Sequence, residues 1–252
     1  MVDSCVLTHF DIQTEDGACD STLAQPEKPG KYPGILFLMD AYGPRAGLFE
    51  MLAKLASRGY IVLLPNLLYR KKRAPIIDVS FPLRPEDMPG ARGKIIPLVT
   101  SYNYEEGLTD VARFLAFLSE QGNCTGVIGA TGYCMGGGLA LRAAARFPER
   151  IRAAASFHGG NLATHAADSI HLLLPQIQAE VYIAHADNDA TMPPEQMERL
   201  DEALKRASFK YEVELYKGAA HGFTMADLPA YDKVAADRHW SKLLSLFERC
   251  VR

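Results

Sequence analysis

Apolar runs of strand length alternate with helical patterns along most of the chain, and this alternation strongly restricts the possible fold. Six runs are continuously apolar, which is typical of strands buried on both faces of a sheet. They span residues 33–40, 59–65, 125–131, 151–159, 180–187 and 211–218. The helical patterns lie at 47–59, 105–122, 136–150, 193–207 and 231–250. The sequence therefore predicts a doubly wound α/β fold, with a mostly parallel sheet and helices on both faces.

Two segments depart from this alternation. Residues 6–14 and 21–27 flank the turn-like sequence EDGA, and we expect them to form an antiparallel hairpin at one edge of the sheet. Residues 66–104 are rich in Pro, Arg and Gly and have no clear period. Long excursions of this kind are usually active-site covers or disordered segments, and the aromatic residues and prolines here favour an ordered cover. We expect one domain over residues 1–252.

Charge and composition favour a small-molecule partner. The chain is 48% hydrophobic and 23% charged, like an ordinary soluble protein, and its net charge of −3 gives no reason to expect nucleic acid or an anionic membrane. The basic run at 70–73 is typical of a solvated loop. No apolar stretch approaches the roughly 20 residues that span a bilayer, and the N-terminal sequence has no basic start followed by an apolar run. We therefore expect a cytoplasmic protein.

The cysteines and acidic residues do not form a recognisable metal site. The five cysteines are scattered and lack CxxC spacing, so we expect reduced thiols rather than a zinc or redox site. Residues 185–189 are rich in possible ligands, but the glycine that a calcium loop needs is missing. We expect no metal and no cofactor.

A lone cysteine stands between two glycines where the run at 125–131 gives way to a helical pattern. Gly132-Tyr133-Cys134-Met135-Gly136 has the G-x-S-x-G spacing of a nucleophile elbow, with sulfur in place of oxygen. A sharp strand-to-helix turn crowds the flanking positions, so glycine is needed there. The amides and dipole of the following helix favour a thiolate, and the Met135 amide is placed to stabilise an oxyanion. A buried structural cysteine is the alternative.

An acid and a histidine follow the elbow in the order that this type of site requires. The loop after the run at 180–187 offers Asp187 and Asp189, and His221 follows the run at 211–218. The carboxyl ends of parallel strands share one edge of the sheet, so these side chains are expected to meet Cys134 there. A helix cap or a structural histidine would explain either residue alone. Their common order and placement favour a catalytic triad.

These motifs resemble those of the dienelactone hydrolases (carboxymethylenebutenolidases) of the α/β-hydrolase superfamily. An elbow cysteine followed by Met-Gly-Gly is the most specific match, because most relatives in the superfamily use serine. The resemblance implies an α/β-hydrolase fold, with Cys134 as nucleophile, Asp189 rather than Asp187 as acid, and His221 as base. The matching stretches follow the family's order over nearly the whole chain: YPGILFLMDAYG, GYIVLLPNLLYR, GATGYCMGGGLAL, SFHGG, DNDATMP and AAHGF.

The resemblance also concerns the groups around the nucleophile. It implies that Ala41 supplies the second oxyanion amide. At the position of Asp40 the family has a glutamate that pairs with the resting cysteine, and aspartate is one methylene shorter. The family's founding members have an arginine shortly after the catalytic histidine to hold a substrate carboxylate, whereas this chain reads HGFTM at 221–225. Arg84 and Arg92 in the cover segment are candidates to replace it.

We therefore predict a hydrolase of small esters or lactones that acts through a thioester intermediate. The missing arginine suggests a substrate less acidic than a dienelactone. Organophosphate hydrolysis by the same triad is one alternative, because a thiolate can also attack phosphorus, and a non-catalytic binding module is another. The sequence does not define an oligomeric state. Tyr42, Tyr133 and Phe223 adjoin the predicted catalytic groups in sequence, and His158 stands at a strand end. All four are expected either to line the substrate pocket or to pack in the core.

Overall fold

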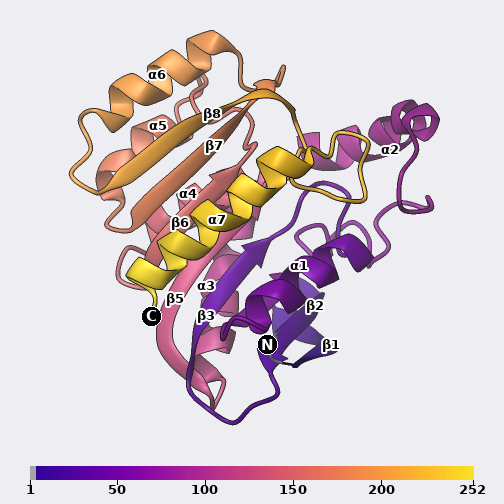
Figure 1. Ribbon diagram of the computed structural model, residues 1–252, viewed down its shortest axis with the longest axis vertical. Coiled ribbons are helices and arrows are strands. Elements are labelled where there is room, and N and C mark those ends of the chain that lie inside the picture. Colours follow the sequence, from indigo (N-terminus) through magenta and orange to yellow (C-terminus); the bar gives the residue numbers. More distant parts are fainter. Residues whose placement is uncertain (1–3) are drawn as a thin grey trace.

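One sheet of eight strands forms the centre of the protein. The computed structural model describes residues 4–252, and the strand order is β1-β2-β4-β3-β5-β6-β7-β8 (Figure 1). The β1–β2 and β2–β4 pairs are antiparallel, and the other neighbours are parallel. The predicted mostly parallel sheet and its edge hairpin are thus confirmed. The strands are β1 (Cys5–Thr14), β2 (Gly17–Pro26), β3 (Tyr32–Leu38), β4 (Ile61–Pro65), β5 (Cys124–Tyr133), β6 (Ile151–Phe157), β7 (Glu180–Asn188) and β8 (Tyr211–Ala220).

Helices cover both faces of this sheet. In Figure 1, α1 and α7 lie in front of it, and α3 and α4 lie behind it, in agreement with the strands that each helix contacts. The α-helices are α1 (Ala46–Ala56), α2 (Met88–Thr100), α3 (Tyr104–Glu120), α4 (Met135–Arg146), α5 (Ile170–Leu173), α6 (Pro194–Leu204) and α7 (Lys233–Cys250). Two short 3₁₀ helices span Pro85–Asp87 and Leu174–Gln176.

Local sequence explains where two of the long helices begin. Asn103 caps α3, because its side-chain oxygen accepts hydrogen bonds from Glu105 N at 2.9 Å and Glu106 N at 3.4 Å. Its side-chain amide also donates to the Glu106 carboxylate at 3.1 Å. Asp232 caps α7 by accepting from Ala235 N at 2.9 Å. These caps satisfy amides that have no partner within the helix.

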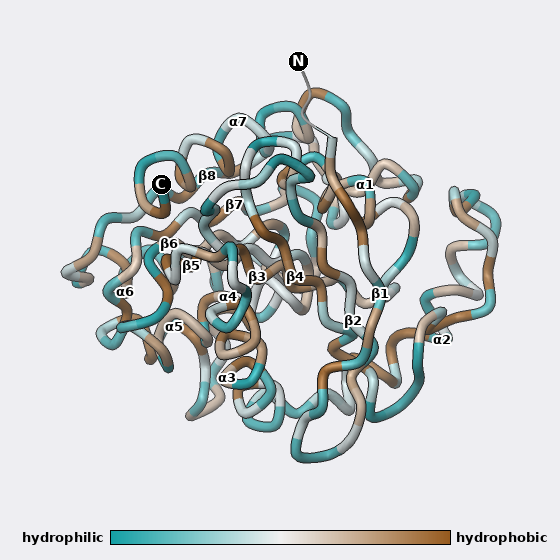
Figure 2. Tube along the Cα trace, turned by 90° about the horizontal axis from the view of Figure 1, so that it is seen from below, coloured by the Kyte–Doolittle hydropathy of each residue, from teal (hydrophilic) through white to brown (hydrophobic). Residues whose placement is uncertain are grey.

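Residues 66–104 contain a helix that the sequence pattern did not predict. α2 has Gly90 and Gly93 in its first half and Pro97 near its end, and of its residues only Ala91 and Ile95 are buried. A surface helix is normally recognised in a sequence from apolar residues that recur every three or four positions on its buried face. α2 has too few buried residues to produce this pattern. Figures 1 and 2 both place α2 at the periphery of the molecule, whereas hydrophobic strands lie at its centre in Figure 2.

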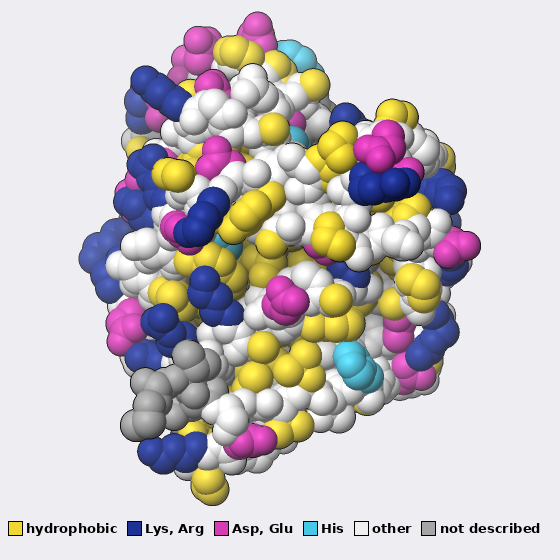
Figure 3. Space-filling view, turned by 45° about the vertical axis from the view of Figure 1, so that its right-hand side comes forward, with side chains coloured by type: hydrophobic (Ala, Val, Ile, Leu, Met, Phe, Trp, Pro, Cys, Tyr) yellow, Lys and Arg dark blue, Asp and Glu magenta, His cyan; other side chains and the backbone are white. Residues whose placement is uncertain are grey.

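The two arginines of the basic run at 70–73 are paired with acidic side chains of the same protein. Arg70 contacts Asp16 at 2.6 Å and Asp110 at 2.5 Å, and Arg73 contacts Asp11 at 2.7 Å. On the face drawn in Figure 3, Lys and Arg side chains are interspersed with Asp and Glu. These ion pairs leave less unbalanced positive charge to attract nucleic acid.

Phe247 of α7 tests how strongly this helix stabilises the sheet. Its side chain is fully buried, lies 5.8 Å from the Tyr60 ring, and faces Gly129 of β5, where an added Cβ would lie 2.9 Å from the Phe247 ring. We expect Phe247→Ala to lower the free energy of unfolding by about 3–5 kcal/mol, because it removes buried area and leaves a cavity. Urea denaturation measures this loss. Val234→Ala is the control on the same helix, because Val234 is 81% exposed, and it should change the free energy by no more than about 0.5 kcal/mol. Equal effects of the two substitutions would contradict this account of the packing.

Candidate active site

Cys134 occupies a sharp turn between β5 and α4. Its backbone has φ 55° and ψ −120°, a conformation that is unusual and strained for a residue other than glycine. An added Cβ at Gly132 would lie 1.9 Å from the Gly136 carbonyl oxygen, and one at Gly136 would lie 2.3 Å from the Leu38 carbonyl oxygen. Both contacts are impossible for a side chain, so glycine is required on each side of the turn. The local structure is thus the strand-turn-helix that the G-x-C-x-G spacing predicts.

The close approach at Gly136 brings two backbone amides to the same region. Met135 is the first residue of α4, so its amide has no acceptor within the helix. The same glycine packs on the end of β3 at Leu38, and Ala41 follows three residues later. Within residues 4–252, the Ala41 amide makes no hydrogen bond. Both predicted oxyanion donors are therefore without an acceptor among the residues that the structure describes.

His221 and Asp189 meet at the ends of β7 and β8. The register of the two strands shifts between Ala186 and Asn188, so that Asn188 pairs with Ala220, and His221 N donates to Asn188 O at 3.2 Å. His221 Nδ1 lies 2.6 Å from Asp189 Oδ2. The other carboxylate oxygen of Asp189 accepts from Thr191 N at 2.9 Å and from Thr191 Oγ1 at 2.6 Å. Asp189 is therefore fixed on both sides, and it orients the imidazole.

The electrostatics of His221 connect it to the cysteine. Burial lowers the pKa of His221, but the negative charge of the Cys134 thiolate and hydrogen bonds to Asp189 and Cys134 outweigh this and raise it to about 10. For Asp189, burial raises the pKa, but the hydrogen bond and charge of His221, with the Thr191 hydrogen bonds, lower it overall. These two shifts favour a protonated His221 beside the Asp189 carboxylate.

The structure separates the two candidate acids. Asp187 Oδ2 accepts a hydrogen bond from Gly218 N at 2.9 Å, so Asp187 supports the backbone of β8 from an exposed position. Asp189 is the one that contacts His221, and only 2% of its side chain is exposed.

Asp40 does not pair with the thiol in this structure. Its two carboxylate oxygens accept hydrogen bonds from Arg45 Nη1 at 2.7 Å and Nη2 at 2.8 Å. Oδ1 also accepts from Tyr42 N at 3.0 Å. The expected resting contact between this carboxylate and Cys134 is therefore replaced by an arginine fork.

The four candidate pocket residues are largely buried. Tyr133 and Phe223 are core residues: the Tyr133 hydroxyl lies 2.9 Å from His239 Nε2, and Phe223 stacks on Tyr216. His158 lies behind His221, with 5.1 Å between ring centroids, and its Nε2 is 2.8 Å from Thr224 Oγ1.

Tyr42 is close enough to the candidate nucleophile for the charge of Cys134 to affect its pKa. Burial is the largest cause of its raised pKa, and the charges of Asp40 and Cys134 contribute to the rise, while Arg92 and Arg45 oppose it. Its hydroxyl donates to Met88 Sδ at 3.8 Å. Tyr42 therefore links the loop after β3 to the start of α2.

The two candidate replacements for the missing arginine differ in position. Arg84 is exposed and pairs with Asp87 at 2.8 Å and Glu86 at 3.3 Å. Arg92 is exposed on α2, close enough to Tyr42 to lower its pKa. Met225, four residues after His221, is buried. Arg84 is thus engaged elsewhere, while Arg92 lies near the edge of the site.

Sequence reasoning missed Tyr104, at the start of α3. Burial and the charge of Cys134 raise the pKa of Tyr104 to about 12, although Arg142 opposes the rise. The Arg142 guanidinium lies 4.6 Å from the centre of the Tyr104 ring. The signal in the sequence was weak, because an aromatic residue at a helix start is more often part of the core.

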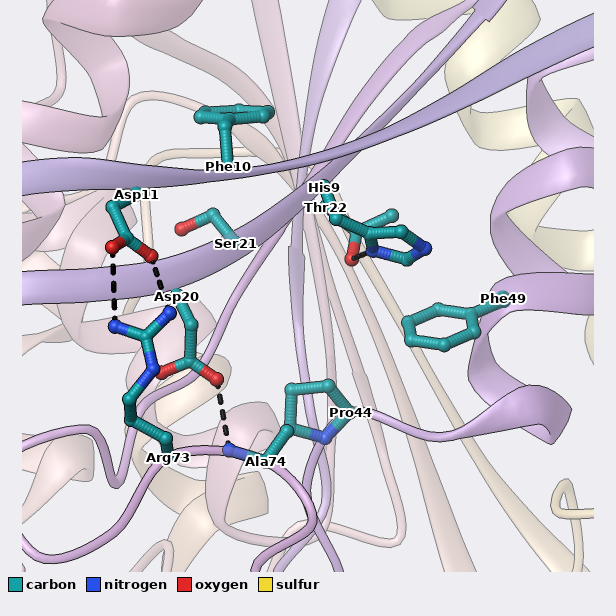
Figure 4. Close-up of a pocket in the computed structure, with 10 residues that line it drawn as sticks. All are labelled: His9, Phe10, Asp11, Asp20, Ser21, Thr22, Pro44, Phe49, Arg73 and Ala74. Carbon is teal, nitrogen blue, oxygen red and sulfur yellow. Dashed lines mark hydrogen bonds and ion pairs between the residues drawn. The ribbon is translucent and has the colours of Figure 1, made fainter.

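A groove of about 420 Å³ lies away from these residues (Figure 4). Its polar groups largely pair with one another: Arg73 with Asp11, Asp20 with Ala74 N at 2.9 Å, and His9 with Thr22 at 2.8 Å. It contains neither the cysteine nor the His221 pair, so the chemistry points to the strand ends and not to this groove. Within residues 4–252, no cluster of His, Cys, Asp and Glu could hold a metal ion. No helix in that range is long and apolar enough to cross a membrane.

Comparisons with known proteins agree with this geometry. By sequence, the chain is 25% identical over 230 residues to a Synechocystis sp. protein named "Putative carboxymethylenebutenolidase", covering 90% of this chain and 89% of that protein. By structure, it superposes on a "Putative Dienelactone Hydrolase" from Klebsiella pneumoniae with a TM-score of 0.84 and 20% identity, covering 98% and 99% of the two chains. A dienelactone hydrolase-like promiscuous phosphotriesterase from metagenomic libraries gives a TM-score of 0.75 and 23% identity, covering 98% of each chain. The model of the dienelactone hydrolase family matches residues 19–251. This chain, with its α/β-hydrolase fold, therefore belongs to the dienelactone hydrolase family.

Proposed function

We propose that the protein hydrolyses small esters or lactones by covalent catalysis at Cys134. One observation carries this proposal: His221, whose pKa is raised in part by the charge of the elbow cysteine, has its Nδ1 2.6 Å from the buried Asp189 carboxylate. Nucleophile, base and orienting acid in contact are what an activated nucleophile requires. We also propose that residues 1–252 form one cytoplasmic domain, in which segment 66–104 covers part of the site.

Acylation follows from this arrangement. The Cys134 thiolate attacks the carbonyl carbon, and the developing oxyanion is held by the amides of Met135 and Ala41. When the tetrahedral species collapses, the C–O bond breaks and the leaving alkoxide takes the Nε2 proton of His221. A thioester on Cys134 and a free alcohol result, or a tethered alcohol when the substrate is a lactone. Asp189 keeps the imidazole in the required orientation throughout.

Deacylation reverses the roles of the same groups. Neutral His221 takes a proton from water as the oxygen of that water attacks the thioester carbonyl. The C–S bond then breaks, the carboxylic acid leaves, and the thiolate–imidazolium pair is restored. The proton that His221 gave to the alcohol is thus replaced by one from water.

The charge next to the site favours uncharged substrates. Asp40 and Asp227 both pair with Arg45, so two buried carboxylates share one guanidinium and leave one excess negative charge. This charge repels a substrate carboxylate, and the buried Met225 offers no counterion after His221. Neutral esters and lactones avoid this repulsion.

Phosphotriester hydrolysis is the second candidate activity. A promiscuous phosphotriesterase is among the proteins that share this fold, and a thiolate can attack phosphorus as well as carbon. Phosphotriesters are also uncharged, so the excess negative charge near the site does not disfavour them. Assays with a lactone and a phosphotriester in parallel separate the two activities.

Replacement of the nucleophile tests the proposed chemistry directly. We expect Cys134→Ser to lower kcat/KM for a chromogenic short-chain ester by about 10³-fold or more, because the triad acts as a unit and a hydroxyl ionises far less readily than a thiol. Rapid-quench mass spectrometry of the wild type should show an acyl group on Cys134. Cys124→Ala changes another partly buried cysteine of β5 and should retain activity. Undiminished turnover in Cys134→Ser would exclude the mechanism.

The thiolate–imidazolium pair makes a prediction about the titration of His221. In the wild type, the NMR signal of this ring should titrate near pH 10, so His221 stays protonated at neutral pH and loses its proton as the pH rises. Cys134→Ser removes the negative charge that favours the imidazolium, and burial then has more influence. We expect the pKa of His221 to fall towards or below its usual value of about 6.5. An unchanged titration in the variant would show that Cys134 does not interact with the ring.

The charge argument is tested with one lactone in two forms, a free carboxylate and its methyl ester. We expect kcat/KM to be higher for the methyl ester by about 10-fold, the factor that corresponds to about 1.4 kcal/mol. Asp227→Asn removes the excess negative charge and should narrow this ratio. A preference for the carboxylate form in the wild type would contradict the expected selectivity and point to a counterion such as Arg92.

A further inference from the structure

A buried ion cluster lies beside the candidate active site, and the proposed chemistry does not use it. Arg45 Nη1 and Nη2 lie 2.7 Å and 2.8 Å from the two oxygens of Asp40. On its other side, Arg45 Nε and Nη2 lie 2.7 Å and 3.1 Å from the two oxygens of Asp227. The side chains of Arg45 and Asp40 are 6% and 4% exposed, and that of Asp227 is 11% exposed.

This cluster joins the loop that carries Ala41 to the loop that carries His221. Asp40 immediately precedes Ala41, and its Oδ1 accepts from Tyr42 N at 3.0 Å, so the carboxylate holds the backbone on both sides of the oxyanion amide. Asp227 lies six residues after His221, in the loop that connects β8 to α7. The Arg45 guanidinium therefore spans the two loops that must be aligned during attack on a carbonyl.

The cluster is also packed so that it has little freedom to rearrange. The Arg45 guanidinium lies 5.1 Å from the centre of the Phe81 ring and 5.6 Å from that of the Tyr42 ring. The Asp227 backbone carbonyl accepts from Leu83 N at 2.9 Å. At Gly47 of α1, an added Cβ would lie 2.5 Å from Asp227 Oδ2. Segments from four parts of the chain thus fix the ion cluster in one arrangement.

The stability of the folded protein does not by itself explain why a buried ion cluster is present. Removing charged groups from water is costly, and apolar side chains of similar volume often stabilise a protein as well or better. A planar guanidinium that binds two carboxylates at once does supply fixed geometry, which a lysine cannot reproduce.

We propose that Arg45 is a positioning residue that aligns the Ala41 amide with the Cys134–His221 pair, through Asp40 on one side and Asp227 on the other. This inference rests on the proposed function, because it concerns the oxyanion hole of that reaction. Arg45 itself contacts no reacting atom.

Two reactions of the Cys134 thiolate distinguish a loss of alignment of the Ala41 amide from a general disruption of the site. Ester hydrolysis forms an oxyanion and needs the Ala41 amide, whereas alkylation of Cys134 by iodoacetamide occurs at a saturated carbon and needs only the thiolate. For Arg45→Lys we expect kcat to fall by about 10²-fold, the usual effect of losing one oxyanion donor, with KM changed by less than about 3-fold. The alkylation rate should stay within about 2-fold of the wild type, because the thiolate needs no oxyanion donor.

Asp110→Asn is the matched control. It breaks a partly buried Arg–Asp contact, with Arg70 at 2.5 Å and 3.0 Å, between α3 and the turn after β4. Its unfolding midpoint should fall, while kcat and the rate of alkylation stay close to those of the wild type.

Asp227→Asn keeps the Asp40–Arg45 fork and provides a milder test if Arg45→Lys does not fold. It should lower kcat without lowering alkylation.

Three outcomes would overturn the proposal: an Arg45→Lys enzyme with the kcat of the wild type, a parallel loss of hydrolysis and alkylation, or an equal loss of kcat in Asp110→Asn. A failure of the proposed function looks different, because hydrolysis would then persist in Cys134→Ser whatever Arg45 does.

Discussion

The contact of Gly136 with the end of β3 is the constraint on which the candidate site depends. At this point a helix start and a strand end approach so closely that no side chain fits between them. The approach goes together with the unusual backbone at Cys134, and it brings the end of β3 to the start of α4. A strained conformation of this kind persists only when the surrounding packing determines it, and here buried strands on both sides of β5 do so. The sheet thus stabilises a turn that would be unfavourable in isolation.

Parallel pairing then determines which loops can reach that turn. The strand order places β5, β6, β7 and β8 side by side, so the loops after β7 and β8 open at the same edge as the elbow. Asp189 and His221 stand immediately after those two strands. Their short contact forms at the irregular end of the β7–β8 pair, where the register shifts after Ala186 and Asn188 pairs with Ala220. Two residues that are distant in sequence are thereby brought together by backbone geometry.

The sequence predicted what depends on backbone period and strand ends. Apolar runs located the core strands, and the spacing of two glycines located the elbow. It did not predict the partner of Asp40, because the partner is the cation that lies next to the carboxylate in three dimensions. Arg45 belongs to no sequence motif that would have indicated this contact. Asp227 was missed for the same reason. Tyr133 and Phe223 adjoin functional groups in sequence, yet they point into the core. Proximity in sequence says little about where a side chain points, because successive side chains of a strand face opposite sides of the sheet.

The chain also shows how one acidic position can take different roles within a family architecture. A carboxylate near a thiolate is unfavourable unless a proton or a cation compensates it. In this protein the cation is Arg45, which engages both oxygens of Asp40. The charge of Cys134 acts on His221, whose pKa it helps to raise. Because a guanidinium keeps its charge over the ordinary pH range, Arg45 remains a partner for the carboxylate at this position. The arginine therefore separates the acidic position from the candidate nucleophile.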